Sequence, residues 1–498
     1  MIENTERGLD PPSWDEARAV AHRMVDDAIA YLQGVSDRPS WRDPSPVEAV
    51  FREALPRGPT PLPDLYATLS ESLMPYPMGN VHPRFFAWYM GAGNFTGALG
   101  EFLAAVQGSN LGGGRHAAAM MDRQVVDWLR EAVGFPAGSS GALVSGGSMA
   151  NLMALAVARN AKAGIDVRAL GVAALPRPLR YYASDQVHSC HRKALEALGL
   201  GDVALRRVPS DAGQRIDLDA LRAAIAEDRR DGLQPACIIG TAGTVNTGAV
   251  DDLPALAEIA RREDLWFHVD GCIGALLAVS PAHRHLVRGL GDADSVALDP
   301  HKWLHVPFEA GCVIVRDAAA HRRTFALTPE YLQQSPRGLA SGEWLHEWGL
   351  QTSRGFRALK IWMTIKEHGI EAFGHLIDQN IALAQHLRGM ADSEPELEAI
   401  GTAQINIVCF RYRADGWNEA TTRDVNMEIL MRLQEEGEAT LSDTVLDGRH
   451  CLRAAVVSHR TRQADIDRVV AAVLRIGRDV VRERGGGVDG VRAGAGLR

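Results

Sequence analysis

The stretch SVALDPHKW, residues 295–303, joins a four-residue apolar run to a lysine that is flanked by histidine and tryptophan. A short apolar run bounded by polar residues is typical of a buried strand. At the end of such a strand Lys302 lies in a partly desolvated site, where we expect the pKa of its amine to fall and the neutral amine to form an imine. Taken alone, Lys302 is more often an ordinary surface lysine. Its neighbours in the fold decide between these interpretations.

Apolar runs of the same kind recur on both sides of this stretch and alternate with segments of helical spacing. These runs are GALVSG (141–146), RYYAS (180–184), ACIIGTAGT (236–244), LWFHVDG (265–271) and GCVIVRD (311–317). The alternation indicates an α/β fold with a mostly parallel sheet covered by helices on both faces. Ligands of such sheets bind at the carboxyl ends of the strands, where several of these runs end in polar residues.

The remaining chain predicts an arm, a second domain and a tail. Residues 1–85 are expected to form an N-terminal helical arm, opened by Ser13 and Glu16 at the spacing of a capping box, which packs on another subunit or on the main body. Residues 86–375 form the large domain. The pattern then changes to a small C-terminal α+β domain over residues 376–484. The Gly-rich end, residues 485–498, is expected to be disordered.

The composition excludes several classes of partner. The 498 residues carry 53 Lys and Arg against 62 Asp and Glu, which gives no electrostatic reason to expect nucleic acid or an anionic membrane. The six cysteines are scattered, without the spacing of a disulfide framework. No apolar run approaches the length of a membrane span, and the first residues lack the apolar core of a secretory signal. We expect a cytoplasmic protein that acts on a small molecule.

Two other strand ends carry residues that suit a site around Lys302. Asp270 ends the run LWFHVD about one βαβ step earlier, where a carboxylate can hold the nitrogen of an aromatic ring protonated. A helix cap is an equal alternative, since glycines follow it. The turn SGGSMAN, residues 145–151, precedes an apolar helix, so its free backbone N–H groups can approach an anion such as a phosphate. By itself such a turn is more often only a tight connection.

His188 follows the run RYYAS, and its imidazole can stack flat on an aromatic ring at the end of that strand. A zinc site made of His188, Cys190 and His191 is the alternative, but the sequence offers no second cluster of ligands. The pair His301 and His305 likewise lacks the glutamate and the third ligand of a zinc protease. We therefore predict no metal.

Taken in order, these stretches resemble the group II pyridoxal-dependent decarboxylases, which include aromatic-amino-acid, histidine and glutamate decarboxylases. The resemblance extends from Asn80 to Val480. Its motifs are HPRFFAWY (82–89), GGSMAN (146–151), SDQVHS (184–189), GTAGT (240–244), HVDG (268–271), DPHKWL (299–304), SRGFRALKIW (353–362) and INIVCFRY (405–412). Each motif is weak alone, but their combination in this order is very specific.

The resemblance implies a fold of the aspartate-aminotransferase type, known as fold type I, and a homodimer with its active site at the subunit interface. It implies that pyridoxal 5'-phosphate is bound as a Schiff base on Lys302, with Asp270 at the pyridine nitrogen and His188 stacked on the ring. Gly147 and Ser148 would cradle the phosphate. The other residues of the implied cofactor pocket are Thr241, His301 and the backbone of Asp299.

The resemblance also indicates where the substrate lies. The motif HPRFFAWY would line the substrate side, so Trp88 and Tyr89 suggest an aromatic or apolar amino acid. Simple core packing is an equally good interpretation of both rings. Arg453, in the strand HCLRAAVVS (450–458), is a candidate for contacts with the substrate carboxylate or the cofactor, by analogy with the fold. A surface ion pair is the alternative for this arginine.

The sequence departs from the family in two places. Members often carry Asn before Pro-His-Lys, whereas this chain has Asp299, whose carboxylate would repel a phosphate unless it were turned away. Only its backbone is therefore expected at the cofactor. Decarboxylases of the aromatic type use a mobile loop tyrosine, reaching across the dimer, to protonate the carbanion. A gap-free count puts Leu345 there, with Tyr331 too far upstream, and His346 is our hypothetical donor.

The predicted reaction is the decarboxylation of an L-amino acid to its amine and carbon dioxide. The residues expected to carry it are Lys302, Asp270, His188 and His346. Because the loop tyrosine is missing, the alternative is that the carbanion is protonated slowly and reacts with oxygen. The products would then be an aldehyde and ammonia. A fold relative without catalysis is a third possibility, which the intact lysine and aspartate argue against. A nicotinamide enzyme is disfavoured, because Gly91-x-Gly93 follows no strand.

Overall fold

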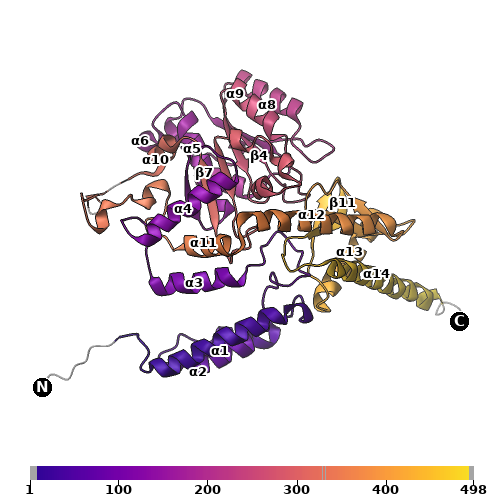
Figure 1. The fold of residues 1–498 in the computed structure, drawn as a ribbon. Coiled ribbons are helices and arrows are strands. Elements are labelled where there is room, and N and C mark those ends of the chain that lie inside the picture. Colours follow the sequence, from indigo (N-terminus) through magenta and orange to yellow (C-terminus); the bar gives the residue numbers. More distant parts are fainter. Residues whose placement is uncertain (1–7, 328, 331–332, 493–498) are drawn as a thin grey trace.

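The computed structural model describes residues 8–327, 329–330 and 333–492, and its large domain is built on one sheet (Figure 1). Within these residues the sheet has seven strands in the order β1-β7-β6-β5-β4-β2-β3. Their bounds are β1 (Ser140–Val144), β2 (Leu179–Ser184), β3 (Leu205–Val208), β4 (Gln234–Thr241), β5 (Trp266–Asp270), β6 (Ser295–Leu298) and β7 (Gly311–Val315). Every neighbouring pair from β3 to β6 is parallel, whereas β7 runs antiparallel to both β6 and β1.

Each of the six apolar runs found in the sequence forms a strand of this sheet. β5, β6 and β7 are buried along their whole length, which explains why their sequences are continuously apolar. Successive residues of β7 enter different hydrophobic cores: Cys312 belongs to one core and Val313 to the other. β3 escapes prediction from the sequence because its four residues, LRRV, include two arginines.

Helices cover both faces of the sheet, and each face has its own core. One core packs under α4 (Ala117–Ala132), α8 (Leu218–Arg230), α9 (Leu253–Arg262) and α11 (Arg357–His368). The other packs under α5 (Gly147–Lys162), α7 (Cys190–Ala197) and α10 (Ala318–Phe325). The short helix α6 (Val167–Leu170) follows α5, and α3 (Phe95–Gln107) packs on α11. This arrangement gathers the carboxyl ends of β2, β4, β5 and β6 at one edge of the sheet.

The N-terminal arm consists mainly of α1 (Trp14–Gln33) and α2 (Leu62–Ser72), which lie side by side below the large domain in Figure 1. Ser13 caps α1 by accepting a hydrogen bond from the Glu16 N–H at 3.3 Å, as the capping-box spacing predicts. A 3-10 helix, Ser45–Arg52, lies within the Pro-rich stretch that joins them. Among the described residues, no helix is both long and apolar enough to cross a membrane.

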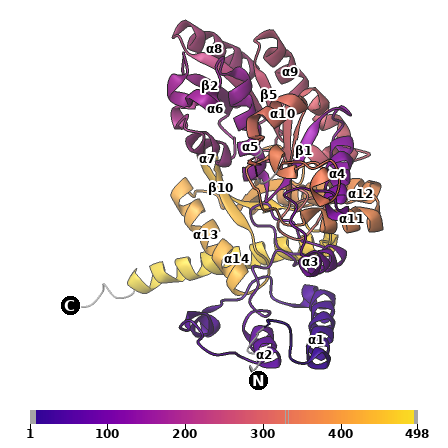
Figure 2. The same cartoon turned by 90° about the vertical axis from the view of Figure 1, so that its left-hand side faces the viewer.

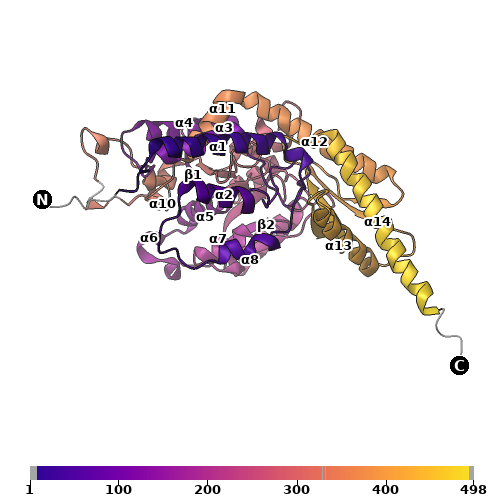
Figure 3. The ribbon, with the colours of Figure 1, turned by 90° about the horizontal axis from the view of Figure 1, so that it is seen from below.

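The C-terminal part has its own antiparallel sheet, in the order β10-β11-β9-β8. Its strands are β8 (Leu397–Ile400), β9 (Ile407–Tyr412), β10 (Ser442–Leu446) and β11 (Arg449–Ala455), and its helices are α12 (Ile370–Ser393), α13 (Glu419–Glu435) and α14 (Gln463–Arg492). α12 runs without a break across the expected domain boundary at residues 375 and 376. α14 projects away from the body (Figures 2 and 3) and continues to Arg492, so residues 485–492 are helical where disorder is expected. Residues 493–498 lie outside the described residues.

The segment that leads from the arm to the large domain is held by the small domain. The Phe86 N–H donates to the carbonyl oxygen of Thr440 at 2.7 Å, and the Ala455 N–H donates to the carbonyl oxygen of Phe86 at 2.9 Å. The Phe86 side chain is buried in the core of the small domain. These contacts fix the position of Trp88 and Tyr89, which follow directly.

The core of the small domain gives a stability prediction. Phe410 in β9 is fully buried, so Phe410→Ala should lower the free energy of unfolding by ~3–5 kcal/mol, measured by chemical denaturation. Val445→Ala, at an exposed position of β10, is the matched control and should change it by less than ~0.5 kcal/mol. Equal effects of the two substitutions would contradict the placement of Phe410 in this core.

Candidate active site

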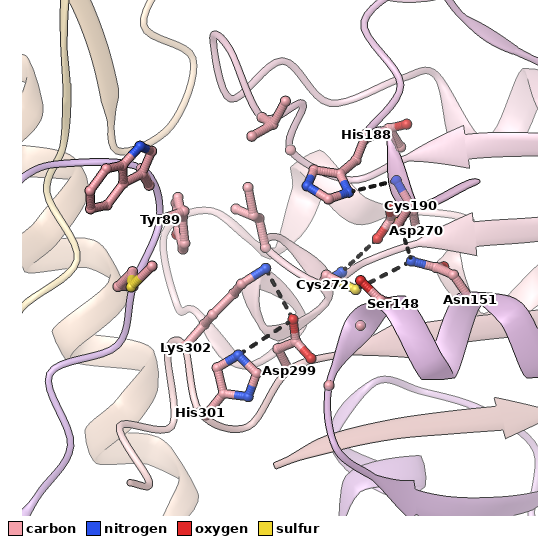
Figure 4. Close-up of a pocket in the computed structure, with 18 of the residues that line it drawn as sticks. Tyr89, Ser148, Asn151, His188, Cys190, Asp270, Cys272, Asp299, His301 and Lys302 are labelled. Carbon is pink, nitrogen blue, oxygen red and sulfur yellow. Dashed lines mark hydrogen bonds and ion pairs between the residues drawn. The ribbon is translucent and has the colours of Figure 1, made fainter. Parts of the chain in front are cut away.

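A cavity of about 660 Å³ lies at the carboxyl ends of the parallel strands, where the large domain meets β10 and β11 (Figure 4). Its size suits a small ligand, and its position is the one expected for this class of sheet. His346 is the only residue of the predicted site that does not line it. The lining residues from that prediction are Trp88, Tyr89, Gly147, Ser148, His188, Thr241, Asp270, Asp299, His301, Lys302 and Arg453.

Lys302 ends in an ion pair. Its Nζ lies 3.0 Å from Asp299 Oδ2 and 5.7 Å from the centre of the Tyr89 ring. Burial is the largest single influence and lowers the pKa of Lys302, but Asp299, with Cys272 and Asp270 behind it, outweighs burial and raises that pKa above its ordinary value. The expected fall in the pKa of Lys302 is therefore wrong. The loop that buries the amine also supplies a carboxylate beside it.

Asp299 directs its side chain into the cavity, contrary to the expectation that only its backbone would face the site. Its Oδ2 lies 3.7 Å from His301 Nε2 in addition to the contact with Lys302, and its Oδ1 has no hydrogen-bond partner among the described residues. A Cβ atom on Gly147 would come within 2.9 Å of Oδ2. The carboxyl group therefore lies between Lys302 and the turn that begins α5.

Asp270, the last residue of β5, is a buried carboxylate with strong partners. Its Oδ2 accepts a hydrogen bond from His191 Nε2 at 2.8 Å, and its Oδ1 accepts one from the Cys272 N–H at 3.2 Å. Burial alone would raise the pKa of Asp270, but the His191 ring, the Cys272 side chain and the charge of Lys302 hold it far below its ordinary value. Asp270 is thus an anion inside a protein core, able to hold a proton on a ring nitrogen in front of it.

His188 lies in the connection between β2 and α7, and its ring lines the cavity. Its Nδ1 accepts a hydrogen bond from the Cys190 N–H at 3.1 Å, which leaves the proton of the neutral ring on Nε2. Burial lowers the pKa of His188, and the charge of Asp270 only partly offsets this effect. The ring is therefore suited to contact through its neutral π face.

A potential metal cluster differs from the one considered in the sequence. The ligand atoms of Cys190, His191 and Asp270 lie within 4.8 Å of one another, so Asp270 stands where the sequence suggested His188. Asp270 and His191 already share a hydrogen bond, and burial raises the pKa of the Cys190 thiol to about 12. This favours the neutral thiol over the thiolate that binds metals.

The turn before α5 forms a cradle of backbone donors. α5 begins at Gly147, no side chain caps it, and the helix dipole favours an anion at this end. Gly147 has no room for a side chain, because a Cβ there would lie 2.3 Å from Cys272 Sγ. Thr241, at the end of β4 and in register with Asp270, has a buried hydroxyl group without a partner among the described residues. The free N–H groups at the start of α5 fit a phosphate.

Two aromatic residues form the wall opposite the sheet. Tyr89 is buried, and its hydroxyl group lies 3.2 Å from Asn406 Oδ1, while its ring faces Lys302. Trp88 lines the cavity but leaves 53% of its surface exposed. Core packing therefore explains the burial of Tyr89, although its ring also faces Lys302. It does not explain the position of Trp88, which is half exposed at the cavity.

Arg453 is buried, and most of its hydrogen bonds are with backbone carbonyl oxygens. Its guanidinium donates hydrogen bonds to the carbonyl oxygens of Trp88, Val245 and Asn246, and to Ser442 Oγ. The alternative of a surface ion pair is wrong for this arginine. It ties together three segments of the cavity wall.

His346 lies in a different hollow of the same chain, and Leu345 beside it does not line that hollow. Leu345 is buried against Leu111 and Ala118, and the Nδ1 of His346 lies 3.1 Å from the carbonyl oxygen of Gly112. The structure therefore does not bring His346 to Lys302 within one chain. Tyr331 lies outside the described residues.

Two residues of the site are not predicted from the sequence: Asn151, which lines the cavity, and His191, which lies behind Asp270. Asn151 Nδ2 donates to the sulfur atoms of Cys190 and Cys272, and its Oδ1 lies 2.7 Å from His268 Nε2. Asn151 stands four residues after Gly147 on α5, which places both on one helix face. That spacing was the signal for Asn151, whereas nothing in the sequence distinguishes His191 as the partner of Asp270.

Comparison with known proteins decides the family of the chain. Residues 44–413 match the model of the pyridoxal-dependent decarboxylase conserved domain. The chain belongs to this family.

The similarity between this decarboxylase and its relatives extends over nearly the whole chain. It is 32% identical to the aromatic-L-amino-acid decarboxylase of Bacillus atrophaeus, with 94% of this chain and 97% of the relative covered. It is 27% identical to the phenylacetaldehyde synthase of Petunia hybrida, with 92% and 93% covered. The crystal structure of Oryza sativa TDC with PLP and tryptamine is similar, with a TM-score of 0.86, 26% identity, and coverage of 95% of this chain and 100% of that one.

The decarboxylase is therefore a carbon–carbon lyase that uses pyridoxal phosphate to remove a carboxyl group from an amino acid. Its predicted fold, a large α/β domain of the aspartate-aminotransferase type with an arm and a small α+β domain, is confirmed. The residues present fit the cofactor. The glycine cradle suits its phosphate, and the ionised Asp270 suits its ring nitrogen.

The glycine cradle gives a prediction about cofactor retention. Gly147→Ala should weaken binding of pyridoxal phosphate by ~10-fold or more, because overpacking against Cys272 and Asp299 costs ~1–3 kcal/mol. Titration of the cofactor-free variant, followed by absorbance, measures the effect. Gly389→Ala, on a helix where a Cβ meets no atom within 4 Å, is the matched control and should bind like the unmodified enzyme. Unchanged binding by Gly147→Ala would contradict the phosphate position.

Proposed function

We propose that the enzyme decarboxylates an aromatic L-amino acid to its amine, with the cofactor held covalently by Lys302. The observation that carries this proposal is the convergence of Lys302, the ionised Asp270 and the glycine cradle on one cavity. Trp88, Tyr89 and Phe308 line the same cavity, which supports an aromatic side chain on the substrate. The name of the Bacillus atrophaeus relative supports the same choice.

Each group of the cofactor has a proposed partner in the chain. The N–H groups of Gly147 and Ser148 would hold the phosphate, with His301 nearby, and Thr241 would lie beside Asp270. Asp270 would hold a proton on the pyridine nitrogen, and His188 would cover one face of the ring. When bound, the cofactor supplies an electron sink for the electron pair that remains after carbon dioxide leaves.

The role of Asp270 depends on His191 in this proposal. A buried carboxylate that remains anionic can keep the adjacent nitrogen cationic, because neither charge is screened by water. The His191 hydrogen bond fixes the orientation of Asp270, and His191 is itself fully buried. His191 is thus proposed as a positioning residue, which acts on the cofactor only through Asp270.

Arg453 is proposed to shape the substrate side of the cavity. Its hydrogen bonds to the carbonyl oxygens of Trp88, Val245 and Asn246 hold these segments at fixed distances. A guanidinium has five N–H donors, and four hydrogen bonds are made here, so one donor is left for a substrate carboxylate. This supports Arg453 as a substrate contact as well as a brace.

The product assay tests the proposed function. Holoenzyme incubated with a panel of amino acids, with products identified by mass, should convert an aromatic amino acid to its amine and carbon dioxide. An aldehyde with ammonia and peroxide would instead support the second outcome, which Leu345 at the loop position and the Petunia hybrida relative favour. Conversion of acidic or basic amino acids alone would contradict an aromatic substrate.

We propose His346 as the proton donor only across a dimer, since it does not line the cavity of its own chain. Its Nδ1 faces the carbonyl oxygen of Gly112, and its Nε2 has no partner among the described residues. His346→Gln should lower amine formation by ~100-fold or more in the same assay. His375→Gln, at an exposed position of α12, is the matched control and should leave it unchanged. Normal amine formation by His346→Gln would remove the residue from this role.

We infer that the enzyme is a cytoplasmic homodimer. The arm exposes Trp14, Leu65 and Leu69, and α3 exposes 63% of Phe102 and 70% of Val106, so large apolar side chains are uncovered in the single chain. A second copy that covers these surfaces would bring the loop carrying His346 near its neighbour. The six free cysteines support a reducing compartment.

The dimer gives a prediction about assembly. Light scattering should report twice the chain mass for the unmodified enzyme and a monomer for Phe102→Glu, because a buried unpaired charge opposes association. Val203→Glu, at an equally exposed apolar position far from the arm and α3 in sequence, is the matched control and should stay dimeric. A dimeric Phe102→Glu variant would contradict the proposed interface.

A further inference from the structure

The Asp299 carboxyl group lies between the Lys302 ammonium, which favours a negative charge on it, and the cradle proposed for the phosphate, which disfavours that charge. Its Oδ2 accepts from the Lys302 ammonium at 3.0 Å, and the same oxygen would lie 2.9 Å from a Cβ on Gly147. Its Oδ1 is buried without a hydrogen-bond partner among the described residues, and only 4% of the residue is exposed. The carboxyl group thus sits against the cradle that is proposed for the cofactor's phosphate.

The negative charge of Asp299 is compensated by one cation. Among the described residues, Lys302 is the only lysine or arginine within ion-pair distance of it. Covalent attachment of the cofactor removes this ammonium from the pair, and a phosphate arrives on the other side of the carboxyl group. Two anions side by side in a buried site repel each other strongly, and a single proton shared between them removes that repulsion.

We propose that Asp299 binds the cofactor's phosphate as a neutral carboxylic acid, through an O–H···O hydrogen bond. The proton comes from Lys302: the ammonium gives one proton to the Asp299 carboxylate and becomes an amine. The amine nitrogen then bonds to the aldehyde carbon, and its two remaining hydrogens leave with the carbonyl oxygen as water. Atoms and charge balance, because the proton stays between Asp299 and the phosphate. This inference rests on the proposed cofactor site.

The other titratable groups around Asp299 do not replace the lost cation. Burial lowers the pKa of His301 and that of His188, so both rings favour the neutral form. Burial raises the pKa of the Cys190 thiol to about 12. The titratable groups that interact with Asp299 are Lys302 and His301 on its own loop, Cys272 just after β5, His188 before α7 and Cys190 at the start of α7.

If Asp299 only supported its loop, cofactor binding would not depend on its proton. A shared proton instead links cofactor binding to pH. As the pH rises, loss of this proton returns the repulsion between the carboxylate and the phosphate. The affinity for the cofactor should therefore fall with rising pH by up to ~10-fold per pH unit, the limit for one linked proton. Asp299→Asn keeps the shape of the side chain and donates an N–H that does not titrate.

The test compares cofactor affinity across pH. Cofactor-free protein is titrated with pyridoxal phosphate between about pH 6, near the second pKa of a phosphate monoester, and about pH 10, below the ordinary pKa of a lysine amine. The unmodified enzyme should lose affinity toward high pH more steeply than Asp299→Asn, and the variant should bind more tightly at the alkaline end. Asp443→Asn changes another aspartate of the cavity wall and, as the matched control, should keep the slope of the unmodified enzyme. Equal slopes in the unmodified enzyme and Asp299→Asn would overturn the proposal.

Phosphorus NMR of the unmodified holoenzyme gives a second readout that needs no variant. The resonance of the bound phosphate should move with pH over the range in which the cofactor is lost, and it should stay constant in Asp299→Asn. A constant resonance in the unmodified holoenzyme would overturn the proposal even if the variant failed to fold. Absence of any covalent cofactor absorbance in the unmodified protein would instead overturn the cofactor site itself, so the two failures are distinguishable.

Discussion

The rest of the structure depends on the spacing between a buried anion and a lysine, which lie at the ends of two neighbouring strands. Asp270 ends β5 and Lys302 follows β6, its parallel neighbour, so the sheet itself sets their separation. Burial would neutralise Asp270, but the His191 ring and the Cys272 side chain lower its pKa and keep it ionised. The cavity, the glycine cradle and the aromatic wall are arranged around these two residues.

Much of this arrangement can be predicted from the sequence, because it follows from short-range patterns. The continuous apolar runs before Asp270 and Lys302 identify buried parallel strands, and polar residues at their ends identify the site. Strands whose sequences lack this pattern are missed: β3 contains two arginines, and β8 contains a glutamate, Glu398. The order of the motifs also predicts the family, and the comparisons confirm this prediction.

The rest depends on distances that no sequence spacing encodes. The pKa of Lys302 is raised because Asp299 turns toward the amine, and a lysine followed by tryptophan does not reveal that rotamer. His191 meets Asp270 only after α7 packs against α5. His346 stands beside the expected loop position in sequence, yet it lies against Gly112 in another hollow. These residues show that electrostatic partners are the least predictable part of the site.

The central claim is that Lys302 holds the cofactor covalently. Reduction of the loaded enzyme with borohydride, followed by digestion and mass mapping of the labelled peptide, tests it most directly. The account predicts that the pyridoxyl group is found on Lys302 alone. A label on another residue, or no label on a loaded and active enzyme, would contradict it.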